Sequence, residues 1–244
     1  MKLGLEHPVM HARPWIAYLC AVLAVTLSTN MHLFAEETEN PEMSEISRTI
    51  AVQRATQVAI WAMPAVTTYG FTRGTLKDLE GDFNDLVTLS QPMVSRHGFL
   101  TANDVTPYVM ASMSTDKGPI VVEIPPASEK TIFFGTIVDA WMRPVVDVGP
   151  TGLDEGKGGK VLLLPVGYEG EVPEEGYFTF QLEGHRADFA FRPVSQNGGT
   201  VEDALAYSRT LKIYPLAKAD NPPETTIHDA FPVVWDTLPY YDLR

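Results

Sequence analysis

The feature that most constrains the fold of this chain is a series of short apolar segments separated by glycine and proline. The clearest is GPIVVEIPP, residues 118–126, in which a β-branched apolar run is bounded by prolines at both ends. Branched side chains fit the pleated surface of a sheet, and proline is tolerated only at the ends of a strand. We therefore predict a central β-strand over residues 118–124.

Similar segments recur from residue 108 onward, with turn-forming residues between them. This spacing predicts an antiparallel β-sandwich or barrel and not a parallel sheet, whose strands would alternate with helices. The predicted strands are residues 108–113, 120–124, 131–138, 161–165, 177–182, 188–191 and 211–216, with weaker candidates at 87–89 and 97–100.

Two helices accompany the strands. Ser44 can cap a helix that runs to about Met63, and Pro64 is expected to end it, because the residue before a proline disfavours the α region. Residues 65–71 are then expected to be extended. Thr200 can cap a short helix over residues 201–210.

The fold class expected from these elements is mainly β: an antiparallel β-sandwich or jelly-roll-like domain with an N-terminal helix and a short C-terminal helix. The domain itself is predicted to span residues 44–216, after a flexible start at residues 36–43. Residues 217–244 are predicted to form a linker and an apolar tail.

The N-terminus has the pattern of a secretory signal peptide, residues 1–35. A basic start precedes an apolar run over residues 15–27, and Ala35 offers a small side chain for cleavage. The apolar run is shorter than the ~20 residues of a membrane span. An uncleaved anchor stays open as an alternative, because Leu33 and Phe34 fit a cleavage site poorly. We predict a periplasmic or secreted protein without stable membrane insertion after cleavage.

Charge and cysteine content exclude several classes of function. The net charge of −13 argues against nucleic acid and against anionic membrane surfaces as partners, because phosphate binding needs a basic footprint. Cys20 is the only cysteine and lies in the predicted leader, so the mature chain has no disulfide and no thiolate nucleophile. No cofactor is expected.

Motifs for nucleophilic and metal chemistry are weak. Ser114 and Lys117 match Ser-x-x-Lys, but a turn between strands explains them more simply. A calcium loop at residues 82–85 lacks the bidentate glutamate. The histidines after the leader include no close pair for zinc, so no metal site is expected. These histidines are His97, His185 and His228.

The better candidates lie at the predicted strand ends, where loops of a sandwich form a rim for ligands. Asp104 and Asp139 are the candidate catalytic carboxylates. These residues could instead have purely structural roles. The acids could form an Asp–Arg pair or Asx turns that fix loop geometry, and the tryptophan could pack in the core. The candidate ligand-binding residues are Asn103, Tyr108, Trp141, Arg143 and Arg192.

Several short motifs follow one another at the distances seen in a known family. They are Asn103-Asp104 with Thr106 and Tyr108; Gly118-Pro119 before Val121-Val122-Glu123-Ile124-Pro125; Asp139; Leu163-Leu164-Pro165 with Tyr168-Glu169-Gly170; Arg192; and Tyr214-Pro215-Leu216. With the helix that ends at Trp61-Ala62-Met63-Pro64, they resemble the domain-of-unknown-function family 1254 (DUF1254) over about residues 44–241.

This resemblance implies a jelly-roll or sandwich protein that bacteria export. Members commonly continue into a second β domain, family 1214, and this chain is expected to stop where that domain would begin, so that either the chain is truncated or its partner is separate. We therefore expect either a separate second β domain or a second copy of the chain as the partner of residues 229–241.

Two functions from different classes remain. The first is a periplasmic binding or assembly module, and the second is a hydrolase that uses Asp104 and Asp139 on a glycan or ester. If the two carboxyl groups lie more than about 10 Å apart, or if one is fully paired to arginine, the hydrolase loses its geometry.

Overall fold

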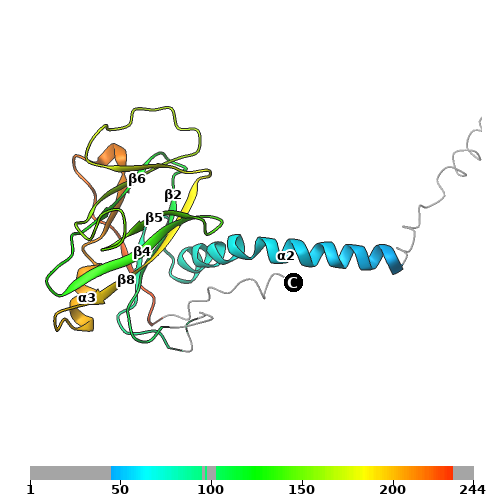
Figure 1. The fold of residues 1–244 in the computed structure, drawn as a ribbon, viewed down its shortest axis with the longest axis horizontal. Coiled ribbons are helices and arrows are strands. Elements are labelled where there is room, and N and C mark those ends of the chain that lie inside the picture. Colours follow the sequence, from blue (N-terminus) through cyan, green and yellow to red (C-terminus); the bar gives the residue numbers. More distant parts are fainter. Residues whose placement is uncertain (1–44, 95–96, 98–102, 233–244) are drawn as a thin grey trace, which may run out of the picture. The chain divides into compact units, whose positions relative to one another are not determined.

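A computed structural model describes residues 45–94, 97 and 103–232 (Figure 1). Its contacts divide the chain into two units, residues 1–57 and 58–244. The described part of the first unit, residues 45–57, is helical and exposed. The predicted leader, the flexible start, Ser44, residues 98–100 and the tail beyond residue 232 lie outside the described residues.

Helix α2 spans Glu45–Arg73 and continues into a π-helical turn, η1, at Gly74–Asp78. The prediction that the helix ends at Pro64 is wrong, and the segment after it is helical, not extended. Contacts formed after the proline explain the difference: Thr68 and Gly70 are buried, and the Thr68 hydroxyl donates to the carbonyl of Ala140 at 2.7 Å. Among the described helices, none combines the length and hydropathy that crossing a bilayer requires.

The strands form two open sheets. The larger has the order β10–β1–β2–β8–β4–β5 and the smaller the order β7–β6–β3–β9. The pairs β1–β10 and β6–β7 are parallel, and the others are antiparallel. The strands are β1 (Leu86–Thr88), β2 (Val109–Ser114), β3 (Ile120–Ile124), β4 (Thr131–Asp139), β5 (Pro144–Val148), β6 (Gly159–Leu164), β7 (Phe178–Gln181), β8 (Arg186–Ser195), β9 (Lys212–Pro215) and β10 (Ile227–Asp229).

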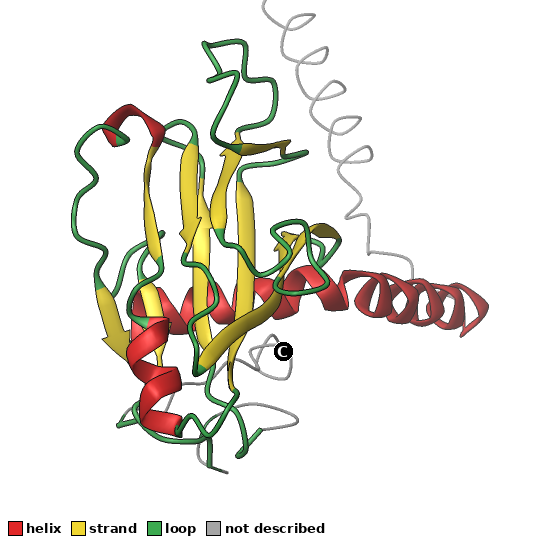
Figure 2. Ribbon diagram, turned by 60° about the vertical axis from the view of Figure 1, so that its left-hand side comes forward, coloured by secondary structure: helices red, strands yellow, loops and turns green. Residues whose placement is uncertain are grey.

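The predicted central strand is confirmed. β3 lies between β6 and β9, and Val121 and Val122 are fully buried. Every other strand predicted between residues 108 and 216 is also present, while β5 and β10 were not predicted. The architecture is a long N-terminal helix, two open sheets and a short C-terminal helix, which is sandwich-like (Figure 2).

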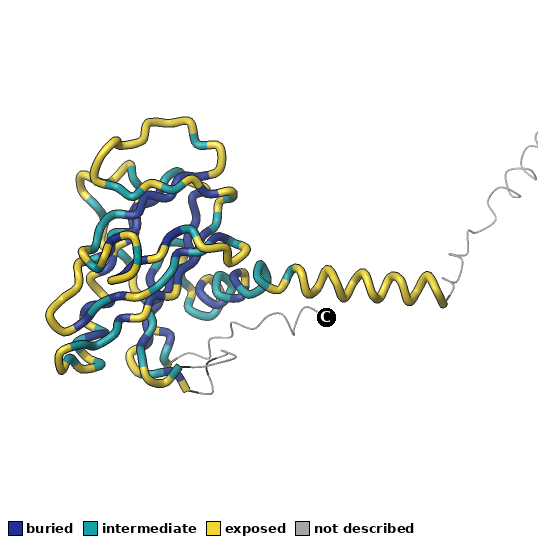
Figure 3. The backbone as a smooth tube through the Cα atoms, in the orientation of Figure 1, coloured by how far each residue is buried: buried dark blue, intermediate teal, exposed yellow. Residues whose placement is uncertain are grey.

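The core lies between the two sheets, where the buried residues gather (Figure 3). One face of β2, β4 and β8 packs on β3, β6 and β9 through branched and aromatic side chains. Helix α3 (Val201–Ser208) begins at the predicted cap, Thr200, whose side chain and that of Asp203 form a capping box. Tyr207 of this helix packs against Phe133 at 4.5 Å between ring centroids.

The alternation of a β-strand leaves the other face of the larger sheet free to carry polar residues. Phe189 and Phe191 of β8 belong to the core, so Asp188, Ala190 and Arg192 lie on the opposite face. The residues of α2 and η1 near Thr68 and Thr75 lie against this face and form a pocket with it.

Candidate ligand pocket

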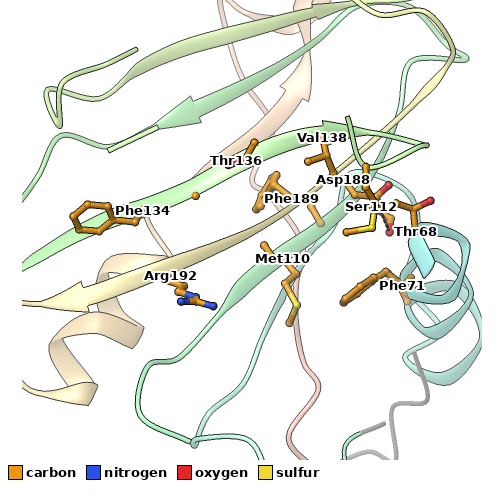
Figure 4. A pocket seen from close by; sticks show the side chains of 15 residues that line it. Thr68, Phe71, Met110, Ser112, Phe134, Thr136, Val138, Asp188, Phe189 and Arg192 are labelled. Atoms are coloured by element: carbon orange, nitrogen blue, oxygen red, sulfur yellow. Dashed lines mark hydrogen bonds between the residues drawn. The ribbon is translucent and has the colours of Figure 1, made fainter. Parts of the chain in front are cut away.

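A cavity of about 420 Å³ lies over the outer face of β2, β8 and β4 (Figure 4). This volume is within the usual range of about 300–1,000 Å³ for small-molecule sites. Most of its lining is apolar, namely Phe71, Met110, Ala111, Phe134, Gly135, Val138, Met142, Phe189 and Ala190. The polar lining side chains are Thr68, Thr75, Ser112, Thr136, Asp188 and Arg192.

The register of the larger sheet positions these side chains. Asp188 lies opposite Ser112 on one neighbouring strand and opposite Val138 on the other. Ala190 lies opposite Met110, and Arg192 lies opposite Phe134. The floor of the cavity therefore changes along β8 from a buried acid, through small and apolar groups, to a cation.

Asp188 is the most unusual group in the cavity. Asp188 is only 8% exposed, and the Ser112 hydroxyl group donates a hydrogen bond to its Oδ1 at 2.7 Å. Burial raises the pKa of Asp188 to about 7, and the opposing effects of the Ser112 hydrogen bond and the Arg186 charge do not cancel it. A carboxyl group with this pKa can donate or accept a hydrogen bond at neutral pH.

Arg192 lies at the other end of the cavity from Asp188 (Figure 4). Its guanidinium group lies over the ring of Tyr108, 5.2 Å from the centroid, and this contact helps to hold it in place. Tyr108 and Arg192 were both predicted to bind a ligand. Only Arg192 lines the cavity, and Tyr108 supports it from the side.

The other predicted arginine has a structural role. Asp139 ends β4, and its Oδ1 accepts hydrogen bonds from the backbone of Trp141 at 2.8 Å and of Arg143 at 3.0 Å. Its Oδ2 accepts from Arg143 Nε at 2.6 Å, and the same guanidinium group also pairs with Glu183 at 2.7 Å. Asp139 and Arg143 thus close the turn between β4 and β5.

This pairing also affects the charge of Asp139. Burial raises the pKa of Asp139, but the hydrogen bonds from Arg143 and from the Trp141 backbone outweigh it and leave the pKa below its usual value. The carboxylate is fully engaged by an arginine, which is the condition under which the Asp104–Asp139 acid–base pair loses its geometry. No observation favours the hydrolase over the binding module.

The remaining predicted site residues also lie apart from the cavity. Asn103 forms an Asx turn: its Oδ1 accepts from the backbone of Val105 at 2.8 Å and of Thr106 at 3.2 Å. Asp104 is exposed beside it. Trp141 packs against Trp61 of α2, with 4.6 Å between ring centroids. None of these lines the cavity, so the structure does not bring the predicted set together.

Within the described residues, no three or more histidine, cysteine, aspartate or glutamate side chains lie close enough together to hold a metal ion. The histidines serve separate contacts. His228 lies 2.8 Å from Asp85, His185 lies 3.7 Å from Asp116, and His97 Nδ1 accepts from the Val94 backbone at 3.0 Å.

Asp188 and Ser112 are the site residues that sequence reasoning missed. A signal for Asp188 was present: it stands in the run Ala-Asp-Phe-Ala-Phe-Arg, where the aromatic residues alternate with smaller or charged ones. Two buried aromatic residues on one face imply that Asp188 and Arg192 share the other. Nothing local shows that this second face is also covered, because the covering residues come from α2.

A family model described as "Protein of unknown function (DUF1254)" matches residues 83–215. No curated protein matches the chain. Among solved structures, the VPA0106 protein from Vibrio parahaemolyticus is similar at 18% identity and a TM-score of 0.51, covering 68% of this chain and 39% of that one. An uncharacterised protein from Burkholderia cenocepacia follows at 10% identity and a TM-score of 0.32, covering 77% and 47%. The chain thus spans less than half of either structure, and the first likeness concerns the fold alone.

Proposed function

The chain belongs to the DUF1254 family of proteins of unknown function, and we propose that it is an exported binding module whose ligand occupies the cavity over β2, β8 and β4. The observation that carries this proposal is an apolar cavity of about 420 Å³ that contains the buried, hydrogen-bonded carboxyl group of Asp188. Apolar walls with a few convergent polar groups are typical of small-molecule sites.

A blocking substitution tests the proposal. Ala190 is exposed on the floor of the cavity, so Ala190→Phe fills the space without entering the core between the sheets. The probe is the neutral fluorophore N-phenylnaphthylamine, whose emission rises in apolar surroundings, with dodecanol as competitor.

We expect the wild-type protein to bind the fluorophore and dodecanol to displace it. Ala190→Phe should weaken binding at least about tenfold, since the ring occupies the site. The matched control is Ala217→Phe, at an exposed position that does not line the cavity and should bind like the wild type. Equal binding by Ala190→Phe and the wild type would show that the cavity is not the site.

Export is part of the same proposal. The leader pattern of residues 1–35 supports a periplasmic or secreted location, and the mature chain would then lack Cys20. Expression in a bacterial host followed by N-terminal sequencing of the periplasmic fraction tests this. We expect a mature protein that begins near Glu36. A membrane-bound product that retains residues 1–35 would instead favour the alternative of an uncleaved N-terminal anchor.

A partner for the C-terminal tail is proposed as well, either a second β domain of family 1214 or a second copy of the chain through residues 229–241. Support comes from the part of the tail that the structure describes: Ala230 is buried, and Phe231 packs beside it on the cluster around Val87. Light scattering of the protein alone, and then mixed with a separately expressed family 1214 domain, distinguishes the two. A monomer in both samples contradicts both.

The jelly-roll relationship belongs to the proposal too. From β2 to β9 the chain passes back and forth between the larger and smaller sheets, and it stays in one sheet only at the antiparallel pair β4–β5 and the parallel pair β6–β7. Connections that pass repeatedly between two packed sheets are typical of Greek-key and jelly-roll sandwiches. An experimental structure of the chain with this connectivity would support the assignment.

A further inference from the structure

We propose that the cavity takes an elongated amphiphile, with an anionic group bound by Arg192, a terminal hydroxyl group bound by Asp188 and Ser112, and an apolar chain between them. This inference rests on the proposed function and adds the chemical class and the orientation of the ligand. It is carried by the two charged residues of the cavity, which stand on one strand and one face (Figure 4).

The separation of the two polar ends follows from strand geometry. Asp188 and Arg192 are four residues apart on β8, and a strand rises about 3.3 Å per residue, so their Cα atoms lie about 13 Å apart. Ala190 stands between them, beside Met110 on β2. A ligand that contacts both ends must therefore be long, with an apolar middle.

Arg192 is suited to an anion. Within the described part of the chain, no carboxylate pairs with its guanidinium group, which contacts the ring of Tyr108. Arg143 and Arg186 differ, since each pairs with a carboxylate at 2.7 Å or less. The guanidinium group of Arg192 therefore keeps its donors for a planar anion such as a carboxylate.

The other end suits a neutral polar group. Asp188 is buried, and the one described hydrogen bond to its carboxyl group comes from Ser112 to Oδ1, so Oδ2 can accept from a ligand hydroxyl group. A charged amine there would have to lose its hydration inside an apolar cavity, which costs more than burying a hydroxyl group. A hydroxyl group also fits either protonation state of Asp188, because it can donate or accept.

The test compares three ligands of one chain length by isothermal titration calorimetry on the full chain, below their micelle-forming concentrations. They are ω-hydroxydodecanoate, which carries both polar ends, dodecanoate, which carries only the anion, and dodecanol, which carries no anion. We expect ω-hydroxydodecanoate to bind about tenfold more tightly than dodecanol or better, with dodecanoate between them.

Two substitutions assign each end. Arg192→Gln should remove the advantage of both carboxylates over dodecanol, and Asp188→Leu should remove only the advantage of ω-hydroxydodecanoate over dodecanoate. Arg209→Gln is the matched control, because Arg209 is exposed and does not line this cavity. It should leave all three affinities unchanged.

The outcomes separate this inference from the proposed function. If all three ligands bind with one affinity in the wild type and in Arg192→Gln, the inference of an amphiphilic ligand is wrong, while the proposed function as an apolar binding site is still supported. If none of the three binds and the fluorophore is not bound either, both the inference and the proposed function fail. A preference for ω-hydroxydodecanoate that survives Arg192→Gln also overturns the inference, because the anion is then held elsewhere.

Discussion

Asp188 decides the chemistry of the cavity, because it is the one carboxyl group among its lining residues and it is buried. Its protonation state sets whether this end of the cavity presents a negative charge or a neutral acid. The pKa near 7 implies that the group is largely protonated in mildly acidic solution and ionised in basic solution.

The raised pKa predicts how stability depends on pH. The folded pKa of about 7 lies above the ordinary 3.8, so between these values the folded protein holds a proton that the unfolded chain releases. The free energy of unfolding therefore falls as pH rises through this window, by about 3 kcal/mol from pH 5 to pH 8. In Asp188→Asn, the free energy of unfolding should not show this fall, because the amide does not titrate. Urea unfolding of both proteins at the two pH values measures it, and equal losses in both would contradict the assignment.

Asp139 and Asp104, the two carboxylates singled out by sequence, should behave differently. Asp139→Ala removes the acceptor that closes the turn between β4 and β5, and we expect a loss of about 1–2 kcal/mol of unfolding free energy. Asp104→Ala is the matched control at an exposed position, with an expected change within about 0.5 kcal/mol. Chemical denaturation measures both. If Asp139→Ala leaves the free energy of unfolding unchanged, the turn does not depend on this carboxylate.

At the scale of secondary structure, α2 shows how tertiary contacts override a local signal. Pro64 removes one backbone donor and disfavours the helix before it, which is why the sequence predicts an end there. The helix continues because the residues beyond the proline become buried and Thr68 bonds to Ala140, far along the chain. No local pattern carries that information.

The position of Pro64 predicts a stabilising substitution. Pro64→Ala restores the missing backbone donor inside α2, and we expect a gain of about 2 kcal/mol after the greater entropy of the unfolded chain is taken into account. Pro223→Ala, in an exposed irregular segment, should instead lose up to about 1 kcal/mol. Thermal unfolding compares the two, and a loss of stability in Pro64→Ala would mean that the proline itself is required for the packing of α2.

The strands were largely predictable, and those that were missed have physical explanations. The segments with β-branched runs and turn residues at both ends, such as residues 120–124, are strands as expected. β10 has only three residues and pairs in parallel with β1, more than a hundred residues away, so its partner and not its own sequence defines it. β5 begins with a proline and follows directly on the Asp139 turn, which conceals its start.

At the scale of the whole molecule, the site depends on four separate stretches of sequence. α2, β2 and the β4–β8 pair each provide a wall or the floor, so sequence reasoning could reach Arg192 as a single residue but not the cavity. A ligand rim at the strand ends was a reasonable prediction for a sandwich, but apart from Arg192 the predicted residues form turns or ring contacts or, like Asp104, are exposed. The cavity instead lies across the face of a sheet.

Ligand binding should also stabilise the whole fold. A ligand that binds only the folded state at one hundred times its dissociation constant adds about 2.7 kcal/mol to the unfolding free energy. Dodecanol at that ratio should therefore raise the midpoint of thermal unfolding of the wild-type protein and leave that of Ala190→Phe unchanged. An equal rise in both would indicate binding outside the cavity.

The most direct test is a crystal structure of the protein with dodecanol bound. We expect an elongated ligand between α2 and the outer face of β2, β8 and β4, in contact with Met110 and Ala190, and with its hydroxyl group within hydrogen-bond distance of Asp188 or Ser112. An empty cavity in crystals grown at saturating dodecanol, or a ligand bound only on another surface, would contradict it.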